Sequence, residues 1–383
     1  MKVLYVYADT PQEWNCSEWN CIIPAKAINM TEKHSAKTIF INEFVQNTPD
    51  SQKLCEEADI IMVERNYFGD TLTGIQFWKG RDKAIGAIFD DAYDLIHPQN
   101  VSYSFWRHGE IKYKESADGP EKTGYMKPKP IEQFVWGLQM VKGVQVPSIN
   151  LAKDWSKYNN TYYVHNFLDM DKYLNVEPLY PDKKKDEIII GWCGSMSHFA
   201  SFNDSGVAQG LRRITKKYPQ VKVLISGDKR VFDLLEVKNK MFQPFVPKEQ
   251  WCPLLKTLDI GLAPLAGEYD KRRSWIKVLE YMALKVPWIA TNYITYDEFH
   301  DYGVMTDNGY KNWELALEKM IEEYPKYKEI AETTGYVFAE SQSSYINVEK
   351  ATIPLYEKLI KDPYPVWQGG FTAYLEGINK ESV

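Results

Sequence analysis

Short apolar runs alternate with longer amphipathic segments along most of the chain. Each run has the length of a buried strand, and the segments between the runs repeat apolar residues at helical spacing. This alternation is typical of βαβ units, which build a parallel sheet. The expected strands span residues 3–8, 38–41, 60–64, 84–89, 143–146, 162–166, 187–195, 221–226, 260–264 and 288–291.

Helices are expected between these strands. They are predicted over residues 24–30, 71–79, 131–140, 148–157, 205–217, 249–257, 274–286, 311–323, 324–338 and 348–361. Residues 101–130 break the alternation, because they are polar, aromatic and rich in Lys, Gly and Pro. We expect no regular element there. Long loops in compact domains tend to be functional or disordered, so this one is a candidate acceptor-binding loop or lid.

Residues 259–291 form the most informative βαβ unit. A polar loop follows strand 260–264 and leads to a helix that Ser274 is expected to cap, with Lys277 on the same face and Glu280 at its border. A lysine and the free N–H groups of a helix start suit phosphate oxygens, and a carboxylate suits two vicinal hydroxyls. The pattern therefore fits a diphosphate and a ribose. On spacing alone it also fits a surface ion pair between Lys277 and Glu280.

Composition narrows the class of protein. The 46 Lys and Arg residues against 52 Asp and Glu residues give a net charge of −6, which argues against a general nucleic-acid-binding protein. The five cysteines show no paired spacing, so we expect a reduced, cytoplasmic protein with free thiols. We expect neither a signal peptide, because the first apolar run ends at Asp9, nor a transmembrane segment, because no apolar run reaches 18 residues.

Two carboxylates follow strand 84–89 directly. Asp90 and Asp91 lie where parallel sheets place functional groups, and either one can hold or deprotonate an acceptor hydroxyl. Aspartates are also common as helix caps and in turns, so a structural role stays open. Arg65, just past strand 60–64, and His108, in the loop of residues 101–130, are further candidates for binding the acceptor.

Residues 259–291 resemble the donor-site segment of GT4-type retaining glycosyltransferases, which have the GT-B fold. In that family a strand D-I-G-L-x-P-L precedes a loop and then S-x-x-K-x-x-E-Y-M-A-x-x-x-P. The matching residues are Asp259, Ile260, Gly261, Leu262, Pro264, Leu265, Ser274, Lys277, Glu280, Tyr281, Met282, Ala283 and Pro287. Where the family often has a second glutamate this chain has Arg272, and Glu268 or Asp270 is the expected substitute.

Residues 190–198 carry the resemblance further. They match I-G-W-x-G-S-x-S-H, whose glycine lets backbone N–H groups close on a phosphate. An Arg and a Lys that many relatives have shortly after this strand are missing here, so Lys229 or Arg230 is expected to substitute. Val246 corresponds to the edge that holds the base through backbone groups. The donor-binding residues that the resemblance implies are Gly194, Ser195, Lys229, Arg230, Val246, Arg273, Ser274, Lys277 and Glu280.

The resemblance is weaker in the first half. Ser17, Trp19 and Asn20 stand where related sequences often have G-x-Y-Y-R, with Asn20 at the arginine position, and they imply an acceptor-side loop. Val164, Asn166 and Asp169 match a V-x-x-N-x-x-D stretch that usually ends the N-terminal domain. The implied acceptor-binding residues are Ser17, Trp19, Arg65 and His108.

The resemblance implies the GT-B fold, with two Rossmann-like α/β domains facing a central cleft. Residues 1–170 are expected to form the acceptor domain and residues 171–361 the nucleotide-sugar donor domain, with a helix over 362–383 crossing back. The implied reaction moves a sugar from a UDP- or GDP-linked donor to an acceptor hydroxyl with retention of configuration. No metal or other cofactor is required, and the expected catalytic residues are Asp90, Asp91, Lys277 and Glu280.

Three alternatives remain open from the sequence. A sugar-nucleotide epimerase has the same two-domain plan and needs no acceptor. A non-catalytic protein that binds a sugar or a nucleotide would hold the donor without turnover. The acceptor itself is undetermined between a glycan, a small molecule, a protein and DNA. A modified DNA base, as in phage glycosylation, would require a basic groove, for which the lysines of residues 112–129 are the candidates.

Overall fold

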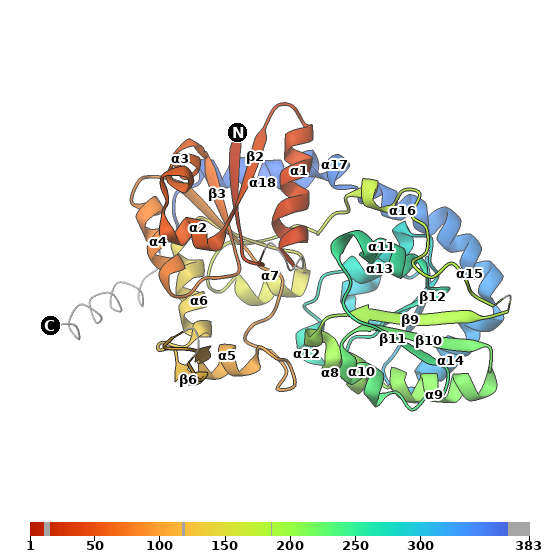
Figure 1. The fold of residues 1–383 in the computed structure, drawn as a ribbon. Helices are drawn as coiled ribbons and strands as arrows, with labels where there is room; N and C mark the ends of the chain where they lie inside the picture. Colours follow the sequence, from red (N-terminus) through yellow and green to blue (C-terminus); the bar gives the residue numbers. More distant parts are fainter. Residues whose placement is uncertain (11–15, 117–118, 185, 367–383) are drawn as a thin grey trace. The chain divides into compact units, whose positions relative to one another are not determined.

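The computed structural model describes residues 1–10, 16–116, 119–184 and 186–366, which alternate between strands and helices (Figure 1). The chain divides into two compact units. The first contains residues 1–94, 104–164 and the chain from 347 onward, and the second contains residues 95–103 and 165–346. These limits differ from the expected 1–170 and 171–361. The expected helix over 362–383 lies largely outside the described residues.

A parallel sheet forms the centre of the first unit, with the strand order β2-β1-β3-β4-β7-β8 in the described chain. Strands β3 and β4 are buried along their whole length, as expected for a parallel sheet that is covered on both faces. Glu64 pairs with Ile88 and is the last residue of β3, so it lies at the carboxyl edge of this sheet. The strands are β1 (Lys2–Tyr7), β2 (Ser35–Phe40), β3 (Ile60–Glu64), β4 (Ala84–Ile88), β7 (Val144–Val146) and β8 (Thr161–Tyr163).

Helices connect these strands, and α18 joins them from the end of the chain. Tyr5 of β1 donates a 3.0 Å hydrogen bond to the Tyr356 hydroxyl, and α18 lies in the first unit. These residues had been expected in the second domain. The helical elements are η1 (Glu18–Ile22), α1 (Ile23–Met30), α2 (Ile41–Gln46), α3 (Pro49–Glu57), α4 (Asp70–Lys79), α6 (Pro130–Met140), α7 (Ile149–Trp155), η6 (Val348–Thr352) and α18 (Ile353–Lys361).

The prediction of no regular element over residues 101–130 is wrong. This stretch contains α5 (Tyr103–His108) and an antiparallel hairpin of β5 (Glu110–Tyr113) and β6 (Lys122–Tyr125). The hairpin strands are mostly exposed, so they lack the alternation of apolar and polar residues that marks a half-buried strand. Trp106 of α5 stacks on Tyr93 with ring centroids 4.1 Å apart, which fixes α5 in the first unit.

A second parallel sheet forms the centre of the second unit, with the order β11-β10-β9-β12-β13-β14 among the described strands. Its core includes Trp192 and Trp313, both fully buried. β9 lies between β10 and β12, so the three strands end side by side at the carboxyl edge. The strands are β9 (Ile188–Gly194), β10 (Val221–Gly227), β11 (Lys240–Gln243), β12 (Ile260–Ala263), β13 (Trp288–Thr291) and β14 (Val304–Thr306).

Amphipathic helices connect the strands of the second unit. Their bounds are η2 (Met170–Tyr173), η3 (Met196–His198), α8 (Phe199–Ser205), α9 (Val207–Lys217), α10 (Lys229–Leu234), α11 (Lys248–Lys256), α12 (Gly267–Asp270), α13 (Ile276–Ala283), η4 (Ile294–Phe299), α14 (Tyr310–Glu322), α15 (Tyr324–Ile330), η5 (Ala331–Gly335), α16 (Tyr336–Ser341) and α17 (Ser344–Asn347). None of the helices in the described ranges combines the length and the apolar character that crossing a bilayer requires.

Candidate functional site

The loop before α13 differs in one respect from the expected helix start. Ser274 is not the N-cap, because α13 begins at Ile276 and Trp275 occupies the cap position. The Ser274 hydroxyl instead donates a 2.9 Å hydrogen bond to Oδ1 of Asn166. Trp275 is buried, and its indole N–H donates to the backbone carbonyl of Asn166 at 2.8 Å. The side chains at this helix start are therefore held by residue 166, which lies about 110 positions earlier.

Lys277 lies in the first turn of α13 and reaches β9. Its ammonium group donates a hydrogen bond to the backbone carbonyl of Cys193 and lies 5.7 Å from the centre of the Trp192 ring. Burial lowers the pKa of Lys277 from its ordinary value. An ammonium group has three N–H donors, so a lysine with one carbonyl partner at a strand end keeps donors for an anionic ligand.

Glu280 lies one turn further along α13 and is buried. The Tyr173 hydroxyl and the Trp251 indole N–H both donate to its Oε1, at 3.1 and 2.8 Å. Its other oxygen, Oε2, has no hydrogen-bond partner among the described residues. Burial raises the pKa of Glu280 to about 7, although both donors and Lys277 act to lower it. The carboxylate is thus oriented through one oxygen, which leaves the other for a ligand hydroxyl.

The carboxyl ends of the parallel strands β9 and β10 lie in close contact beside Lys277. Gly227 has a φ of +94°, and a Cβ atom there would lie 2.2 Å from the carbonyl oxygen of Gly194. Only glycine fits both this conformation and this close approach. After Gly194 the hydroxyls of Ser195 and Ser197 lie 2.9 Å apart. The glycines thus bring two strand ends and two serine hydroxyls together at the carboxyl edge of the second sheet.

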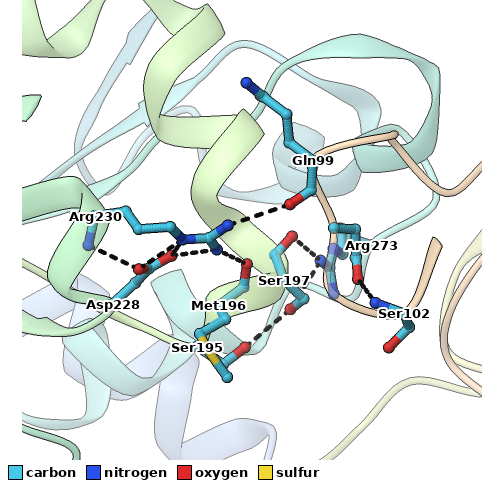
Figure 2. A network of polar contacts seen from close by, with 9 residues as sticks. Gln99, Ser102, Ser195, Met196, Ser197, Asp228, Arg230 and Arg273 are labelled. Atoms are coloured by element: carbon cyan, nitrogen blue, oxygen red, sulfur yellow. Dashed lines mark hydrogen bonds and ion pairs between the residues drawn. The ribbon is translucent and has the colours of Figure 1, made fainter. Parts of the chain in front are cut away.

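Arg230 and Lys229, the two expected substitutes for the family's phosphate-binding residues, take different positions. Arg230 binds the buried Asp228 carboxylate and donates to the carbonyls of Met196 at 2.7 Å and Gln99 at 3.3 Å (Figure 2). The exposed Lys229 forms an i, i+4 ion pair with Asp233. Of the two cations, Arg230 is the one that reaches the turn after β9.

Arg273 approaches the same turn from the loop before α13. Its guanidinium lies 3.4 Å from the Ser197 hydroxyl and 3.4 Å from Oδ1 of Asp270. Asp270 is fully buried, and burial raises the pKa of its carboxyl group while Arg273 opposes the rise. Glu268, the other acidic candidate, points to solvent and pairs with Lys271 and Arg272. Asp270 is therefore the one that takes part in the buried network.

Val246 follows β11 and is buried, whereas Phe245 before it is 47% exposed. The Phe245 ring lies 6.1 Å from the ring of Trp251, the residue that donates to Glu280. A backbone segment with one exposed aromatic ring is thus linked to the Glu280 carboxylate through Trp251. This arrangement is suited to holding the flat face and the polar edge of a base.

A second polar cluster lies at the carboxyl edge of the first sheet, around Glu64. The Ser17 hydroxyl and the Ala8 N–H donate to Oε2 of Glu64, the latter at 2.9 Å, and Asn20 donates to its Oε1 at 3.0 Å. Burial raises the pKa of Glu64 to about 7, and these three donors oppose the rise. Glu64 therefore holds the start of η1 against the end of β1.

Ser17 and Arg65, two of the expected acceptor-binding residues, are brought together through Asp9. The Asp9 N–H donates to the Ser17 hydroxyl at 2.9 Å, and the Asp9 carboxylate forms an ion pair with Arg65. Arg65 has a φ of +36°, a strained conformation for a residue with a side chain. Strain of this kind directly after a strand is characteristic of functional sites.

Asp90 and Asp91 lie next to this cluster. Burial, followed by the charges of these two aspartates, raises the pKa of the Cys16 thiol. Burial also raises the pKa of the Tyr93 hydroxyl, with Asp90 adding to the rise and Arg65 opposing it. The Tyr93 hydroxyl is buried, and the described residues provide no hydrogen-bond partner for it. The first unit thus gathers carboxylates and a buried phenol at one sheet edge.

Two expected acceptor residues lie less centrally. Trp19 is half-buried within η1, and His108 is exposed at the end of α5. Across the described ranges, no group of three or more His, Cys, Asp and Glu side chains is arranged to hold a metal ion.

Several residues of these clusters were not predicted. Glu64 was predicted only as the last residue of strand 60–64, and Tyr173, Trp251 and Asn166 were given no role in the site. Asn166 carried a signal, because it matches the V-x-x-N-x-x-D stretch. The contact between Tyr173 and Glu280 joins positions 107 residues apart, and no local pattern announces it.

Solved structures with this fold include HepE from Anabaena in complex with UDP and glucose, at a TM-score of 0.62 and 14% identity over 94% of this chain and 100% of that one. Sucrose-phosphate synthase from Thermosynechococcus elongatus matches with a TM-score of 0.58 and 11% identity, over 94% of this chain and 98% of that one. UDP-GlcNAc 2-epimerase from Neisseria meningitidis bound to UDP-GlcNAc matches with a TM-score of 0.52 and 12% identity, over 94% of this chain and 100% of that one. No family model and no curated sequence matches the chain.

These likenesses extend over nearly the whole of each chain, so they establish the fold. The protein has the two parallel-sheet α/β domains of the GT-B class, which confirms the fold class predicted from the sequence. At identities of 14% and below they carry no residue roles. The chemistry has to be argued from the side chains themselves.

Proposed function

We propose that the protein is a GT4-type retaining glycosyltransferase that takes its sugar from a UDP- or GDP-linked donor. The observation that carries this proposal is the pair on α13. Lys277 reaches the end of β9, and Glu280 is oriented through Oε1, while no described residue bonds its Oε2. The likeness to HepE, which was solved with UDP-glucose and with UDP, supports a donor of this class.

The donor-side roles follow from charge and position. Lys277, Arg230 and Arg273 supply positive charge around the turn of residues 194–197, where Ser195 and the backbone N–H groups offer further donors to a diphosphate. Glu280 accepts from the ribose hydroxyls, and the backbone at Val246 holds the base. We assign Lys229 at most an outer role, since it pairs with Asp233.

In the proposed step the bond between the anomeric carbon and the distal phosphate oxygen breaks. The acceptor oxygen bonds to the same carbon on the same face. The acceptor proton passes to the carboxylate of Asp90 or Asp91, or to the leaving diphosphate oxygen where that carboxylate only holds the hydroxyl. Lys277 and the arginines stabilise the charge that develops on the leaving diphosphate, which we expect to be the largest contribution to the rate. These cationic side chains take the part that a metal ion plays in other transferases.

The acceptor is proposed to bind in the first unit, at the cluster of Ser17, Arg65, Asp90 and Asp91, with Trp19 and His108 further out. Asp90 or Asp91 holds or deprotonates the acceptor hydroxyl. The experiment is a thermal-shift screen with UDP, GDP, ADP, CMP and their sugars, followed by an acceptor screen with the stabilising donor and assignment of the product anomer by NMR. Absence of stabilisation by every nucleotide, or a product of inverted configuration, would contradict the proposal.

Asp90→Asn and Asp91→Asn separate the two halves of the site. In the proposed mechanism one of these variants loses transfer by about 10²–10⁴-fold, the range for a general base, while nucleotide affinity stays at the wild-type value. A variant that loses nucleotide binding in the same proportion would place the carboxylates on the donor side instead.

An epimerase is the second candidate, and the likeness to the Neisseria meningitidis enzyme favours it. Incubation of the protein with labelled donor alone distinguishes the two. Conversion of the sugar without an acceptor identifies an epimerase, whereas an unchanged donor that is consumed only after an acceptor is added identifies a transferase. A donor that binds and is never consumed indicates a non-catalytic binding protein.

A further inference from the structure

The chain passes from the first unit into the second at residue 165, and the segment that follows lies against the candidate donor site. We call residues 165–173 the entry segment. Its first residue, His165, stacks on Trp275 with ring centroids 3.5 Å apart and planes inclined by 13°. Burial lowers the pKa of His165 to about 4, so the ring stacks as a neutral imidazole.

Asn166 makes the most direct contact with the start of α13. Its Oδ1 accepts from the Ser274 hydroxyl at 2.9 Å, and its backbone carbonyl accepts from the Trp275 indole at 2.8 Å. Asn166 and Trp275 are buried at 7% and 3% exposure, so the bond from the indole is shielded from water, and the bond from the half-buried Ser274 is partly shielded. Lys277 follows Trp275 by two residues, and these bonds therefore set the position from which its side chain extends.

The far end of the entry segment touches the second site residue of α13. The Tyr173 hydroxyl donates to Oε1 of Glu280 at 3.1 Å. Together with Trp251, it turns the carboxylate so that Oε2 is the oxygen without a partner among the described residues. One stretch of nine residues thus contacts both ends of the site that α13 provides.

The entry segment is itself held by residues 342–345, which lie just before the chain returns to the first unit. Leu168 forms a parallel bridge with Ser343, through backbone hydrogen bonds of 3.0 Å to Gln342 and 2.7 Å from Ser344. The Tyr345 hydroxyl bonds the carboxylates of Asp169, at 2.5 Å, and Asp171, at 2.7 Å. These contacts hold the entry segment in place independently of α13. A residue that positions another needs such independent support.

We propose that Asn166 and Tyr173 are positioning residues of the donor site. Asn166 fixes, through its bonds to Ser274 and Trp275, the helix start that presents Lys277 to the diphosphate, and Tyr173 selects the Glu280 oxygen that meets the ribose. This inference rests on the proposed function, and it deepens it by adding the entry segment to the donor site.

The test is isothermal titration of the full chain with UDP and, in parallel, GDP at pH 8, for wild type, Asn166→Ala, Ser274→Ala and the double variant. Alanine at 166 removes the Oδ1 bond and keeps the backbone bond to Trp275. Asn159→Ala is the matched control, because Asn159 is also a buried asparagine and donates to the carbonyls of Leu138 and Val141 in the first unit. Thermal midpoints are recorded for each variant.

We expect Asn166→Ala and Ser274→Ala each to weaken nucleotide affinity by about tenfold, and the double variant by about tenfold as well, since both changes remove one shared bond. Asn159→Ala is expected to lower the thermal midpoint and to leave the affinity within about twofold of wild type, as for a distant site. An Asn166→Ala affinity within twofold of wild type, or a double variant that loses the product of the single losses, overturns the inference for Asn166.

Tyr173→Phe gives an independent readout. Loss of one donor to Glu280 Oε1 raises the pKa of this carboxyl group further, so the pH at which nucleotide affinity reaches half of its maximum moves upward. An unchanged pH profile overturns the role of Tyr173. If wild type binds neither nucleotide, the proposed function fails and this inference fails with it. If wild type binds and the variants match it, only the inference fails.

Discussion

The ammonium group of Lys277 donates a hydrogen bond to the backbone carbonyl of Cys193, so a side chain of α13 ends at the edge of β9. The two residues are 84 positions apart in sequence. This bond distinguishes the observed arrangement from a surface ion pair between Lys277 and Glu280, because each of the two side chains has its own partner in the interior. A half-buried ammonium group at a strand end is costly to keep without a ligand that uses its charge.

Lys277→Ala is expected to lower the rate of sugar transfer by about 10²–10³-fold, because it removes a cation that stabilises the leaving diphosphate in the transition state. The measurement is kcat with the donor found in the thermal-shift screen. Lys271→Ala is the control, since Lys271 is exposed and pairs with Glu268 on the same loop. If the Lys277→Ala variant transfers sugar as fast as this control, Lys277 does not have the proposed role.

Glu280 makes both stability and binding depend on pH. Its pKa in the folded protein, about 7, lies above the ordinary value of 4.5, so the folded state binds more protons between these values. Stability from this group is therefore fully present below pH 4.5 and is lost as the pH rises through 7. The loss is about 3 kcal/mol at most, from a shift of roughly 2.5 pKa units.

The variant that tests this relationship is Glu280→Gln, whose side-chain oxygen still accepts from Tyr173 and Trp251. We expect a higher thermal midpoint than wild type at pH 8 and an equal one at pH 4. Nucleotide affinity of wild type should increase as the pH rises toward 7, because the ribose needs the carboxylate, and the variant should bind weakly at every pH. Equal midpoints at pH 8 would contradict the raised pKa.

The sequence was sufficient for ten of the strands and for placing Lys277 and Glu280 on one helix, whereas β5, β6, β11 and β14 were not predicted. Buried strands such as β3 and β4 are continuous apolar runs, and Lys277 and Glu280 share a helix, so periodicity alone relates them. The predicted start of α13 was wrong. Serine is a common N-cap residue, which favoured Ser274, but the burial of Trp275 and its bond to Asn166 set the backbone conformation there. Tertiary packing overrode a local preference there.

The cluster in the first unit shows the other limit of sequence reasoning. Glu64 meets Ser17 and Asn20 only because β1 and β3 are neighbours in the sheet, and sequence separations of 47 and 44 residues hide that contact. The burial that raises the pKa of Glu64 is likewise a property of the folded chain. Arg65 was predicted as a site residue because it follows a strand. Its strained φ angle could not be predicted from the sequence.

Glu64→Ala is expected to destabilise the protein by about 2–4 kcal/mol at pH 6, because it leaves the donors of Ser17, Asn20 and Ala8 without their acceptor in the interior. The measurement is urea unfolding, with Glu57→Ala as the control. Glu57 is exposed at the end of α3, and its substitution should cost no more than about 0.5 kcal/mol. Equal unfolding midpoints for the two variants would show that Glu64 does not hold η1.

Gly227→Ala tests the close contact between the ends of β9 and β10. The φ of +94° is strained for alanine, and the added Cβ would lie 2.2 Å from the Gly194 carbonyl, so backbone has to move at the turn assigned to the diphosphate. Gly267→Ala is the matched control, because its φ of +79° carries similar strain with no atom within 4 Å of the added Cβ. We expect the control to cost about 1 kcal/mol of unfolding free energy and Gly227→Ala at least about twice that, with nucleotide affinity reduced more than tenfold. Equal costs for the two variants, measured by urea unfolding, would mean that the strand ends move apart freely and that the turn is not the rigid phosphate-binding element proposed.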